Sequence, residues 1–220
     1  MRAIFFCLNF VAVFHGLTRA ADGINGFDTV QSLTVDKIHC LKRNGYSAFI
    51  ARVYVSSGNF DQVGMQNIKT ANAAGLLFVD AYLFPCVDTS CPSGAQQVKS
   101  VINEMAAQRL GITRIWLDIE KYQWSGNMQS NQAFIRDMVH QAQNMSMDVG
   151  IYTSYSNWQA IVGLDWNEFR ILPLWYADYD GHADFSGFRP FGGWDQAEIH
   201  QFQANFNGPC GVRMDLDWFP

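Results

Sequence analysis

The stretch Arg114-Ile115-Trp116-Leu117-Asp118-Ile119-Glu120 decides how this sequence is interpreted. Its apolar residues predict a short buried strand that ends in two carboxylates, Asp118 and Glu120. Side chains two residues apart point to the same face of a strand, so these carboxylates should stand side by side where the strand meets a loop. Two like charges held that close raise the pKa of one of them. One protonated and one ionised carboxylate together can cleave a glycosidic bond. The alternative is that the two acids are merely solvated at the end of a strand and have no catalytic role.

The first twenty residues have the pattern of a signal peptide. Arg2 is followed by an apolar run at residues 3–14, which is too short to span a bilayer. Thr18 and Ala20 are small residues at the positions that a signal peptidase requires, which predicts cleavage after Ala20. We therefore expect a signal peptide at residues 1–20 and one catalytic domain at residues 21–220. The protein should be secreted, or delivered to a lysosomal or phagosomal lumen.

The mature chain is acidic and large enough for one hydrophobic core. Of the 15 Lys and Arg residues, Arg2 and Arg19 leave with the signal, so 13 remain against 20 Asp and Glu, a formal charge of −7. Nucleic acid is excluded as a partner, because its binding depends on Lys and Arg that neutralise phosphates. We expect a monomer with no membrane partner.

Four cysteines remain after the signal is removed, and an even number in an oxidising compartment indicates two disulfides. Cys86 and Cys91 flank a short loop and should pair locally, which leaves Cys40 with Cys210. A zinc site is the competing interpretation, but no pair of Cys-x-x-Cys elements supports it. Asn144 begins an N-glycosylation sequon, Asn144-Met145-Ser146. The histidines form no evident constellation, so no metal or other cofactor is expected.

Short apolar runs alternate with amphipathic ones along the chain. Strands are predicted at residues 23–28, 47–55, 76–84, 112–119, 148–153, 172–176, 197–202 and 212–216, and helices at 34–44, 60–74, 93–109, 129–144 and 157–162. This alternation is typical of a parallel sheet with right-handed crossovers. Eight strands predict an α/β fold, an irregular (β/α)8-like (TIM-type) barrel in a single domain, with a loop at residues 180–194. A doubly wound open sheet is the alternative, but no Gly-x-Gly-x-x-Gly follows the first strand.

Acidic residues recur where the predicted strands end: Asp28, Asp118, Glu120, Asp178, Asp215 and Asp217. Functional groups of such a barrel collect at that end, so these acids should form a negatively charged cup. A cup of this kind can bind a hard cation or hydrolyse a glycoside. Aromatic residues at or just beyond strand ends favour a sugar: Tyr82, Trp124, Tyr152, Trp175, Tyr176 and Trp194.

The sequence resembles the glycoside hydrolase family 25 lysozymes, also called Chalaropsis-type lysozymes or N-acetylmuramidases. The resemblance covers essentially all of residues 21–220. It is carried, in order, by Gly26-Phe27-Asp28, Asp80-Ala81-Tyr82-Leu83-Phe84, Trp116-Leu117-Asp118-Ile119-Glu120, Gly150-Ile151-Tyr152-Thr153-Ser154-Tyr155, Leu174-Trp175-Tyr176-Ala177, His200-Gln201-Phe202 and Val212-Arg213-Met214-Asp215-Leu216-Asp217. The chain departs from the family pattern at Leu83, where His is common, at Asp217, where Asn is common, and at His200, where an aromatic residue usually precedes Gln201. These departures should affect the rim of the cleft.

The resemblance implies cleavage of the β-1,4 bond between N-acetylmuramic acid and N-acetylglucosamine in bacterial peptidoglycan, for antibacterial defence or for digestion of bacteria. Glu120 is implied as the general acid, with its pKa raised by ionised Asp118 beside it. Asp118 would also orient the substrate's acetamido group, which attacks the anomeric carbon. The residues implied to bind substrate are Asp28, Asp215, Tyr82, Tyr152, Trp175 and Tyr176.

Three other functions remain compatible with the pattern. A chitinase-like hydrolase would share the barrel, acids and aromatic residues, but such enzymes usually carry a longer Asp-rich strand. An inactive carbohydrate-binding barrel has no need of both Asp118 and Glu120. A metal-dependent hydrolase would be inhibited by a chelator.

Overall fold

A computed structural model describes residues 23–220, so the predicted signal peptide and its cleavage site lie outside the described residues. The strands are β1 (Ile24–Asp28), β2 (Tyr46–Val55), β3 (Asn59–Phe60), β4 (Phe78–Leu83), β5 (Ile115–Asp118), β6 (Val149–Thr153), β7 (Leu174–Ala177), β8 (Ile199–Asn207) and β9 (Arg213–Phe219). The helices are α1 (Val35–Arg43), α2 (Gln62–Ala73), α3 (Gly94–Ala107), α4 (Met128–Asn144) and α5 (Tyr155–Ile161), with a 3₁₀ turn η1 (Pro209–Gly211) between the last two strands.

The strands form one sheet that closes on itself. Its order is β1-β9-β8-β7-β6-β5-β4-β2-β3, and β1 also pairs with β2, so every strand except β3 belongs to a closed barrel. The short β3 only extends β2 as a hairpin. The predicted irregular (β/α)8-like barrel in a single domain is therefore confirmed, and the alternative of an open doubly wound sheet is wrong.

The last strand departs from the prediction of an all-parallel sheet. Strand β9 runs antiparallel to both of its neighbours, β1 and β8, whereas the other barrel pairs are parallel. The reason is that β8 and β9 are joined by the short turn η1, and a short connection permits only an antiparallel pair. Asp215 consequently reaches the carboxyl ends of the other strands from the beginning of β9, where it pairs with Asp28.

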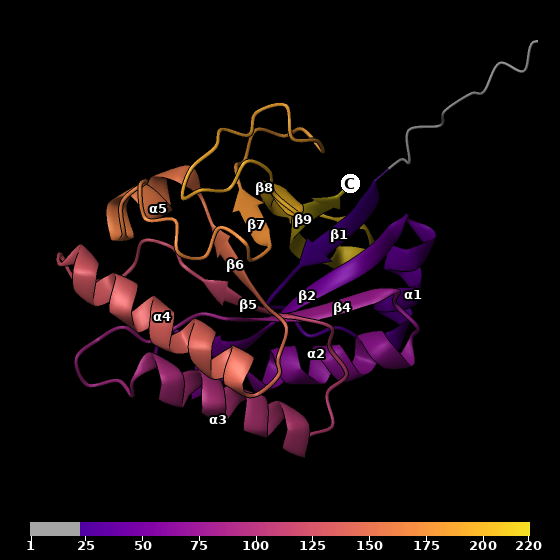
Figure 1. Ribbon diagram of the computed structural model, residues 1–220. Helices are drawn as coiled ribbons and strands as arrows, with labels where there is room; N and C mark the ends of the chain where they lie inside the picture. Colours follow the sequence, from indigo (N-terminus) through magenta and orange to yellow (C-terminus); the bar gives the residue numbers. More distant parts are fainter. Residues whose placement is uncertain (1–22) are drawn as a thin grey trace, which may run out of the picture.

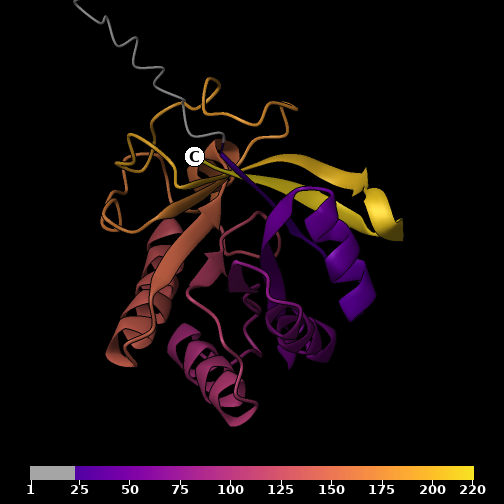
Figure 2. The same cartoon turned by 90° about the vertical axis from the view of Figure 1, so that its right-hand side faces the viewer.

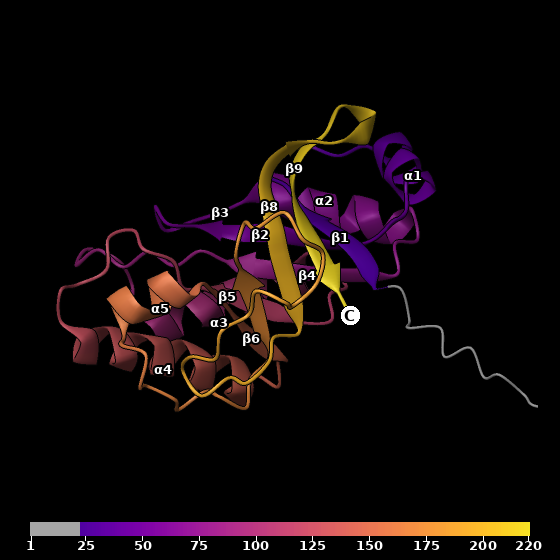
Figure 3. The same cartoon turned by 90° about the horizontal axis from the view of Figure 1, so that it is seen from above.

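In the part of the chain that the structure describes, five helices rather than eight cover the barrel. Helices α2, α3 and α4 lie along one side of the sheet, and the loop between β7 and β8 lies over the opposite side without forming a helix (Figure 1). The β8–β9 hairpin projects from the barrel beside α1 (Figure 2), and its η1 end bends towards that helix when viewed from above (Figure 3). In residues 23–220, no helix is long and apolar enough to cross a bilayer.

Local sequence explains where the helices begin. Thr34 caps α1, as predicted, by accepting a hydrogen bond from the amide of Lys37, and Ser93 forms a capping box with Gln96 at α3. The close packing of α2 on β2 requires Gly64, because a Cβ there would lie 1.6 Å from the carbonyl oxygen of Arg52. The caps fix where α1 and α3 begin, and the contact at Gly64 sets how closely α2 packs on β2.

Two apolar layers make up the core. The larger layer fills the space between strands and helices, and the smaller one fills the barrel itself. Trp175 is the centre of the inner layer, with ring centroids 4.5 Å from Tyr152, 5.9 Å from Trp116 and 6.0 Å from Tyr82. The barrel interior is thus packed with aromatic rings that form a rigid floor beneath the carboxyl ends of the strands.

Both predicted disulfides are present, Cys40–Cys210 and Cys86–Cys91. Cys210 lies in η1 rather than in the last strand, so the first bond ties α1 to the tip of the β8–β9 hairpin. Asn144 is exposed at the last residue of α4, where the predicted sequon remains accessible.

Candidate active site

Four of the predicted acids meet in one cavity at the carboxyl ends of the strands. The cavity has a volume of about 120 Å³. It is lined by Asp28, Tyr82, Asp118, Glu120, Tyr152, Trp175, Tyr179, Gln201 and Asp215. The side chains come from β1, β4, β5, β6, β7, β8, β9 and the segments just beyond β5 and β7, so closure of the barrel is what brings them together.

Asp118 ends β5 and is almost completely enclosed, with 4 % of its surface exposed. Its Oδ1 atom is buried and has no hydrogen-bond partner within residues 23–220. A buried carboxylate oxygen is normally hydrogen-bonded, because its desolvation is otherwise uncompensated. This oxygen is therefore suited to accept a hydrogen bond from a ligand in the cavity.

Glu120 lies two residues beyond Asp118 on a segment held firmly in place. The amide of Ile119 donates to the carbonyl of Tyr152 over 2.8 Å, and the hydroxyl of Thr153 donates to the carbonyl of Ile119 over 2.7 Å. The indole Nε1 of Trp124 donates to the carbonyl of Glu120 over 2.9 Å. Trp124 is thus a support for the backbone of Glu120, while the Glu120 side chain reaches the cavity half-buried.

The acids of the cavity have raised pKa values, and burial is the largest cause for each. Burial raises the pKa of Asp118 well above its ordinary value, with further increases from Glu120 and Asp28. Burial also raises the pKa of Glu120, and the second cause is the charge of Asp215. Repulsion between Asp118 and Glu120 thus raises the pKa of Asp118, whereas the charge of Asp215, on the antiparallel β9, raises that of Glu120.

Asp28 and Asp215 occupy paired positions on β1 and β9. Burial and the charge of Asp215 hold the pKa of Asp28 well above its usual range. Burial also raises the pKa of Asp215, against opposing effects from the amide of Asn205, which donates to its Oδ1 over 2.6 Å, and from Arg213. Like charges held close together in this way oppose one another's ionisation.

Gln201 organises the wall of the cavity opposite β5, and the sequence indicated it only as part of a family motif. Its Nε2 donates to Asp28 Oδ2 over 2.6 Å. Its Oε1 accepts from the hydroxyl of Tyr152 over 2.7 Å and from that of Tyr179 over 3.1 Å. Tyr179 was not predicted as a site residue. Its position just beyond the end of β7, which drew attention to Asp178, could have indicated it. It is 56 % exposed and presents an aromatic face at the mouth of the cavity.

Two predicted residues lie deeper than expected. Asp217 is fully buried inside the barrel, where its Oδ1 accepts from the indole Nε1 of Trp175 over 2.9 Å. The expectation that Asp217 affects the rim is therefore wrong, because it lies two residues further along β9 than Asp215 and below the cavity. Trp175 is 1 % exposed, so it forms the floor rather than an open stacking surface.

Tyr176 and Asp178 do not line the central cavity. They belong to an adjoining one of about 390 Å³, which also includes Glu120, Tyr155 and Arg189. The hydroxyl of Tyr176 donates to Asp178 Oδ2 over 3.2 Å. A second adjoining cavity, of about 350 Å³, continues from Asp28, Tyr82 and Asp215 towards Asn205. The carboxylates therefore lie between two open spaces that share residues with the central cavity.

Other features of the molecule lie away from the acids. Trp194 is buried against Trp158 and Phe191, away from the acids, so it does not contribute to this site. A separate cavity of about 790 Å³ beside Leu174 and Glu198 lies at the opposite end of the barrel. Within residues 23–220, no group of three or more His, Cys, Asp and Glu side chains is arranged to hold a metal ion.

Comparison with known proteins agrees with this arrangement. Residues 19–202 match a family model described as "Lysozyme-like protein 1". The chain is 45 % identical over 196 residues to Lysozyme-like protein 5 of Caenorhabditis elegans, which covers 89 % of this chain and 91 % of that protein. It is 35 % identical over 216 residues to Probable GH family 25 lysozyme 2 of Dictyostelium discoideum, with 97 % and 100 % covered. The solved structure of a muramidase from Acremonium alcalophilum has the same fold, with a TM-score of 0.69 at 22 % identity over 90 % of this chain and 93 % of that one.

Proposed function

This chain belongs to the glycoside hydrolase family 25 lysozymes and is a glycoside hydrolase, and on that basis we propose that it cleaves the β-1,4 bond between N-acetylmuramic acid and N-acetylglucosamine in bacterial peptidoglycan. The observation that carries the proposal is the meeting of Asp118 and Glu120 with Asp28 and Asp215 in one cavity. Open spaces on both sides of these acids suit a polymer that passes through the site.

Glu120 is the proposed general acid. It protonates the oxygen of the leaving sugar as the glycosidic bond breaks, and a general acid must keep its proton near the working pH. Burial and the charge of Asp215 support this role, because both raise the pKa of the Glu120 carboxyl. The hydrogen bond from Trp124 to the Glu120 carbonyl supports a fixed position for the donor.

Asp118 is the proposed partner of the substrate's acetamido group. The acetamido oxygen attacks the anomeric carbon while the amide N–H donates to Asp118, a substrate-assisted route that spares the protein a nucleophile. The buried, unpartnered Oδ1 of Asp118 supports this role. Burial favours the neutral acid, whereas a hydrogen bond from an amide N–H favours the carboxylate, so binding of the sugar itself would ionise Asp118.

The other cavity residues are proposed to hold the sugars. Asp28 and Asp215 position the ring beside Glu120, with Tyr82, Tyr152 and Trp175 as the apolar floor. Tyr176 would act from the adjoining cavity, and Tyr179 adds an exposed aromatic face on which a sugar can stack.

Secretion, or delivery to a lysosomal or phagosomal lumen, follows from the signal-like residues 1–20 and is supported by the two disulfides. We propose that residues 21–220 act as a monomer in digestion of bacteria or in antibacterial defence, at acidic pH. The formal charge of −7 supports an acidic setting, since protonation of carboxylates weakens repulsion from an anionic wall.

The experiment that tests the function is clearing of a Gram-positive cell-wall suspension from pH 4 to 8 by the wild-type protein, Glu120→Gln and Glu104→Gln. Glu104 lies on α3, outside the barrel, and serves as the matched control. We expect Glu120→Gln to lose about 10²–10⁴-fold in rate and Glu104→Gln to retain it. Substantial clearing by Glu120→Gln would contradict the role of Glu120. Release of reducing ends from chitin but not from walls would favour the chitinase-like alternative, and binding of walls without cleavage would favour a carbohydrate-binding barrel.

A further inference from the structure

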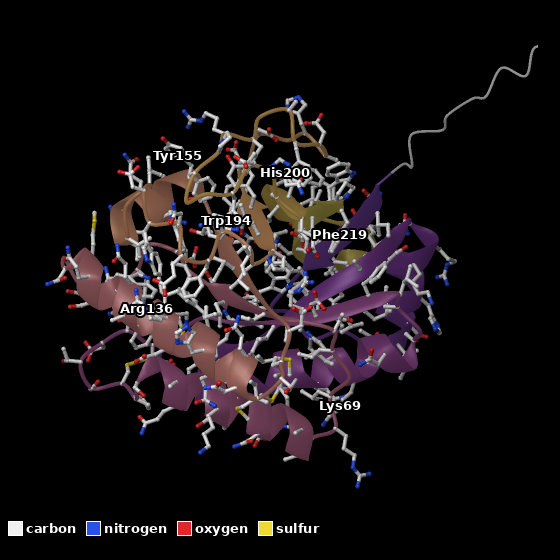
Figure 4. All side chains as sticks on the ribbon, viewed as in Figure 1. Lys69, Arg136, Tyr155, Trp194, His200 and Phe219 are labelled. Carbon is white, nitrogen blue, oxygen red and sulfur yellow. A yellow bond between two sulfur atoms is a disulfide. The ribbon has the colours of Figure 1, made fainter. Side chains whose placement is uncertain are left out.

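His200 is enclosed beneath the loop that joins β7 to β8. It points outward from β8, is 2 % exposed, and lies between the rings of Tyr176 and Phe185 at centroid distances of 5.6 and 6.1 Å. Figure 4 labels His200 where this loop crosses over the sheet. His200 therefore lies outside the barrel interior and does not line the carboxylate cavity, whereas its neighbour Gln201 does.

Both ring nitrogens of His200 face backbone carbonyl oxygens. Nδ1 lies 2.6 Å from the carbonyl oxygen of Asp184, and Nε2 lies 2.8 Å from that of Asp178. A carbonyl oxygen only accepts hydrogen bonds, and a neutral imidazole has a single N–H. Both contacts can be hydrogen bonds only when the ring carries two protons and a positive charge.

The charged groups near the ring are mostly acidic. The loop contributes Asp178, Asp180 and Asp184, and its other ionisable residues before Phe185 are Tyr179 and His182. Asp184 presents its backbone carbonyl to Nδ1, while the carboxylate of Asp180 faces His182 at 3.8 Å. The neighbouring strands offer the hydroxyl of Tyr176, bonded to Asp178, and the apolar rings of Phe202 and Trp218. Within the described residues, no Lys or Arg contacts the imidazole.

We propose that doubly protonated His200 is a positioning residue that clasps residues 178–184 onto β8 and thereby holds Tyr179 at the mouth of the cavity. One end of the clasp is the carbonyl of Asp178, immediately before Tyr179. The hydroxyl of Tyr179 then donates to Gln201 and meets the hydroxyl of Tyr152 at 3.4 Å. A neutral ring can donate to only one of the two carbonyls, so one of the two hydrogen bonds of the clasp is lost.

The clasp couples one wall of the cavity to acidity. An imidazole generally changes its charge between pH 5 and 8, and only a ring with two protons can donate to both carbonyls. The amides of Asp178 and Gly181 report the clasped state, because they donate to the carbonyls of Gln201 and Phe202 over 3.1 and 3.0 Å.

The test combines nitrogen-15 NMR of the histidine rings with hydrogen exchange of the backbone, both on the mature protein at pH 5 and pH 8. At pH 5 both ring nitrogens of His200 should carry protons, and the Asp178 and Gly181 amides should be about tenfold better protected than at pH 8, after correction for intrinsic exchange. His200→Phe should abolish this pH dependence. His182→Gln, an exposed histidine of the same loop, should preserve it.

Either of two results would overturn the proposal: a ring with one proton at pH 5, or wild-type protection that does not change with pH. The ring measurement needs no variant, so it decides the question even if His200→Phe folds poorly. The activity arm rests on the proposed lysozyme function: His200→Phe should raise KM for cell walls several-fold at pH 5 and leave kcat little changed. Failure of the wild-type protein to cleave walls would contradict the proposed function. The NMR of the ring and the hydrogen exchange of the amides would still test the clasp independently.

Discussion

The side chain of Gln201 donates from Nε2 to Asp28 Oδ2 over 2.6 Å, which ties β8 to the carboxylate that ends β1 across β9. The other end of the same amide accepts from Tyr152 and Tyr179. An amide can donate to the acid and accept from the tyrosines at once, whereas a carboxylate can only accept. Gln201 therefore fixes the direction of the hydrogen bonds along this wall of the cavity.

Gln201→Glu reverses that polarity with almost no change in shape. A carboxylate beside Asp28 loses the donor and adds repulsion, and hydrogen bonds to charged groups contribute about 1.5–3 kcal/mol. We expect activity at pH 6 to fall about 10–100-fold, with a lower midpoint in urea unfolding. Gln143→Glu, on the exposed face of α4, is the matched control and should change neither. Wild-type kinetics from Gln201→Glu would show that the amide does not position Asp28.

Asp118→Asn should produce a more stable but inactive protein at pH 8. The wild-type carboxyl is buried, its Oδ1 has no partner, and burial raises its pKa well above the ordinary value. An amide removes the cost of burying a charge but cannot serve as the proposed carboxylate. Chemical denaturation at pH 8 and pH 4 measures the effect, which should shrink at pH 4. The exposed Asp165→Asn is the control, and a lower stability of Asp118→Asn at pH 8 would contradict the argument.

The protein should gain stability as the pH falls from 8 to 5. Burial raises the pKa of Asp28, Asp118 and Asp217 well above the unfolded value, so the folded state binds more protons in this range. Stability rises as the pH falls through these raised pKa values and is complete below the unfolded carboxyl pKa, near about 4. Calorimetry should give a higher Tm at pH 5 than at pH 8, and Asp217→Asn should reduce the difference. A higher Tm at pH 8 would refute this prediction.

The two disulfides should contribute unequally to stability. Cys40 and Cys210 are 170 residues apart in sequence, whereas Cys86 and Cys91 are 5 apart. Loop-closure entropy predicts a loss of about 5 kcal/mol without the long-range bond and about 2 kcal/mol without the local one. Urea unfolding of Cys40→Ser/Cys210→Ser and of Cys86→Ser/Cys91→Ser would compare them. Equal losses would mean that the chain-entropy account does not hold for this barrel.

Much of the fold was evident from the sequence because its elements have strong local signals. Capping by Thr34 and the buried run before Asp118 predicted both the type and the order of the elements. The direction of β9 was predicted wrongly, because strand direction depends on how a connection crosses the sheet and not on the residues of the strand. The site was predicted only in part. Asp28, Asp118 and Glu120 could be placed because they lie at or just beyond the ends of strands. The depth of Asp217 could not be predicted, because it depends on the direction of β9.

The antiparallel closing strand also has a consequence for biosynthesis. A ribosome releases the chain from its amino end, and β9 pairs with both β1 and β8. The barrel therefore cannot close until residues 213–219 have left the exit tunnel, and Asp215 is the last of the four acids to arrive. Until then the nascent chain carries an incomplete set of acids at this cavity. Its hydrolytic capacity should appear in a single step once β9 pairs with β1 and β8, together with the Cys40–Cys210 bond.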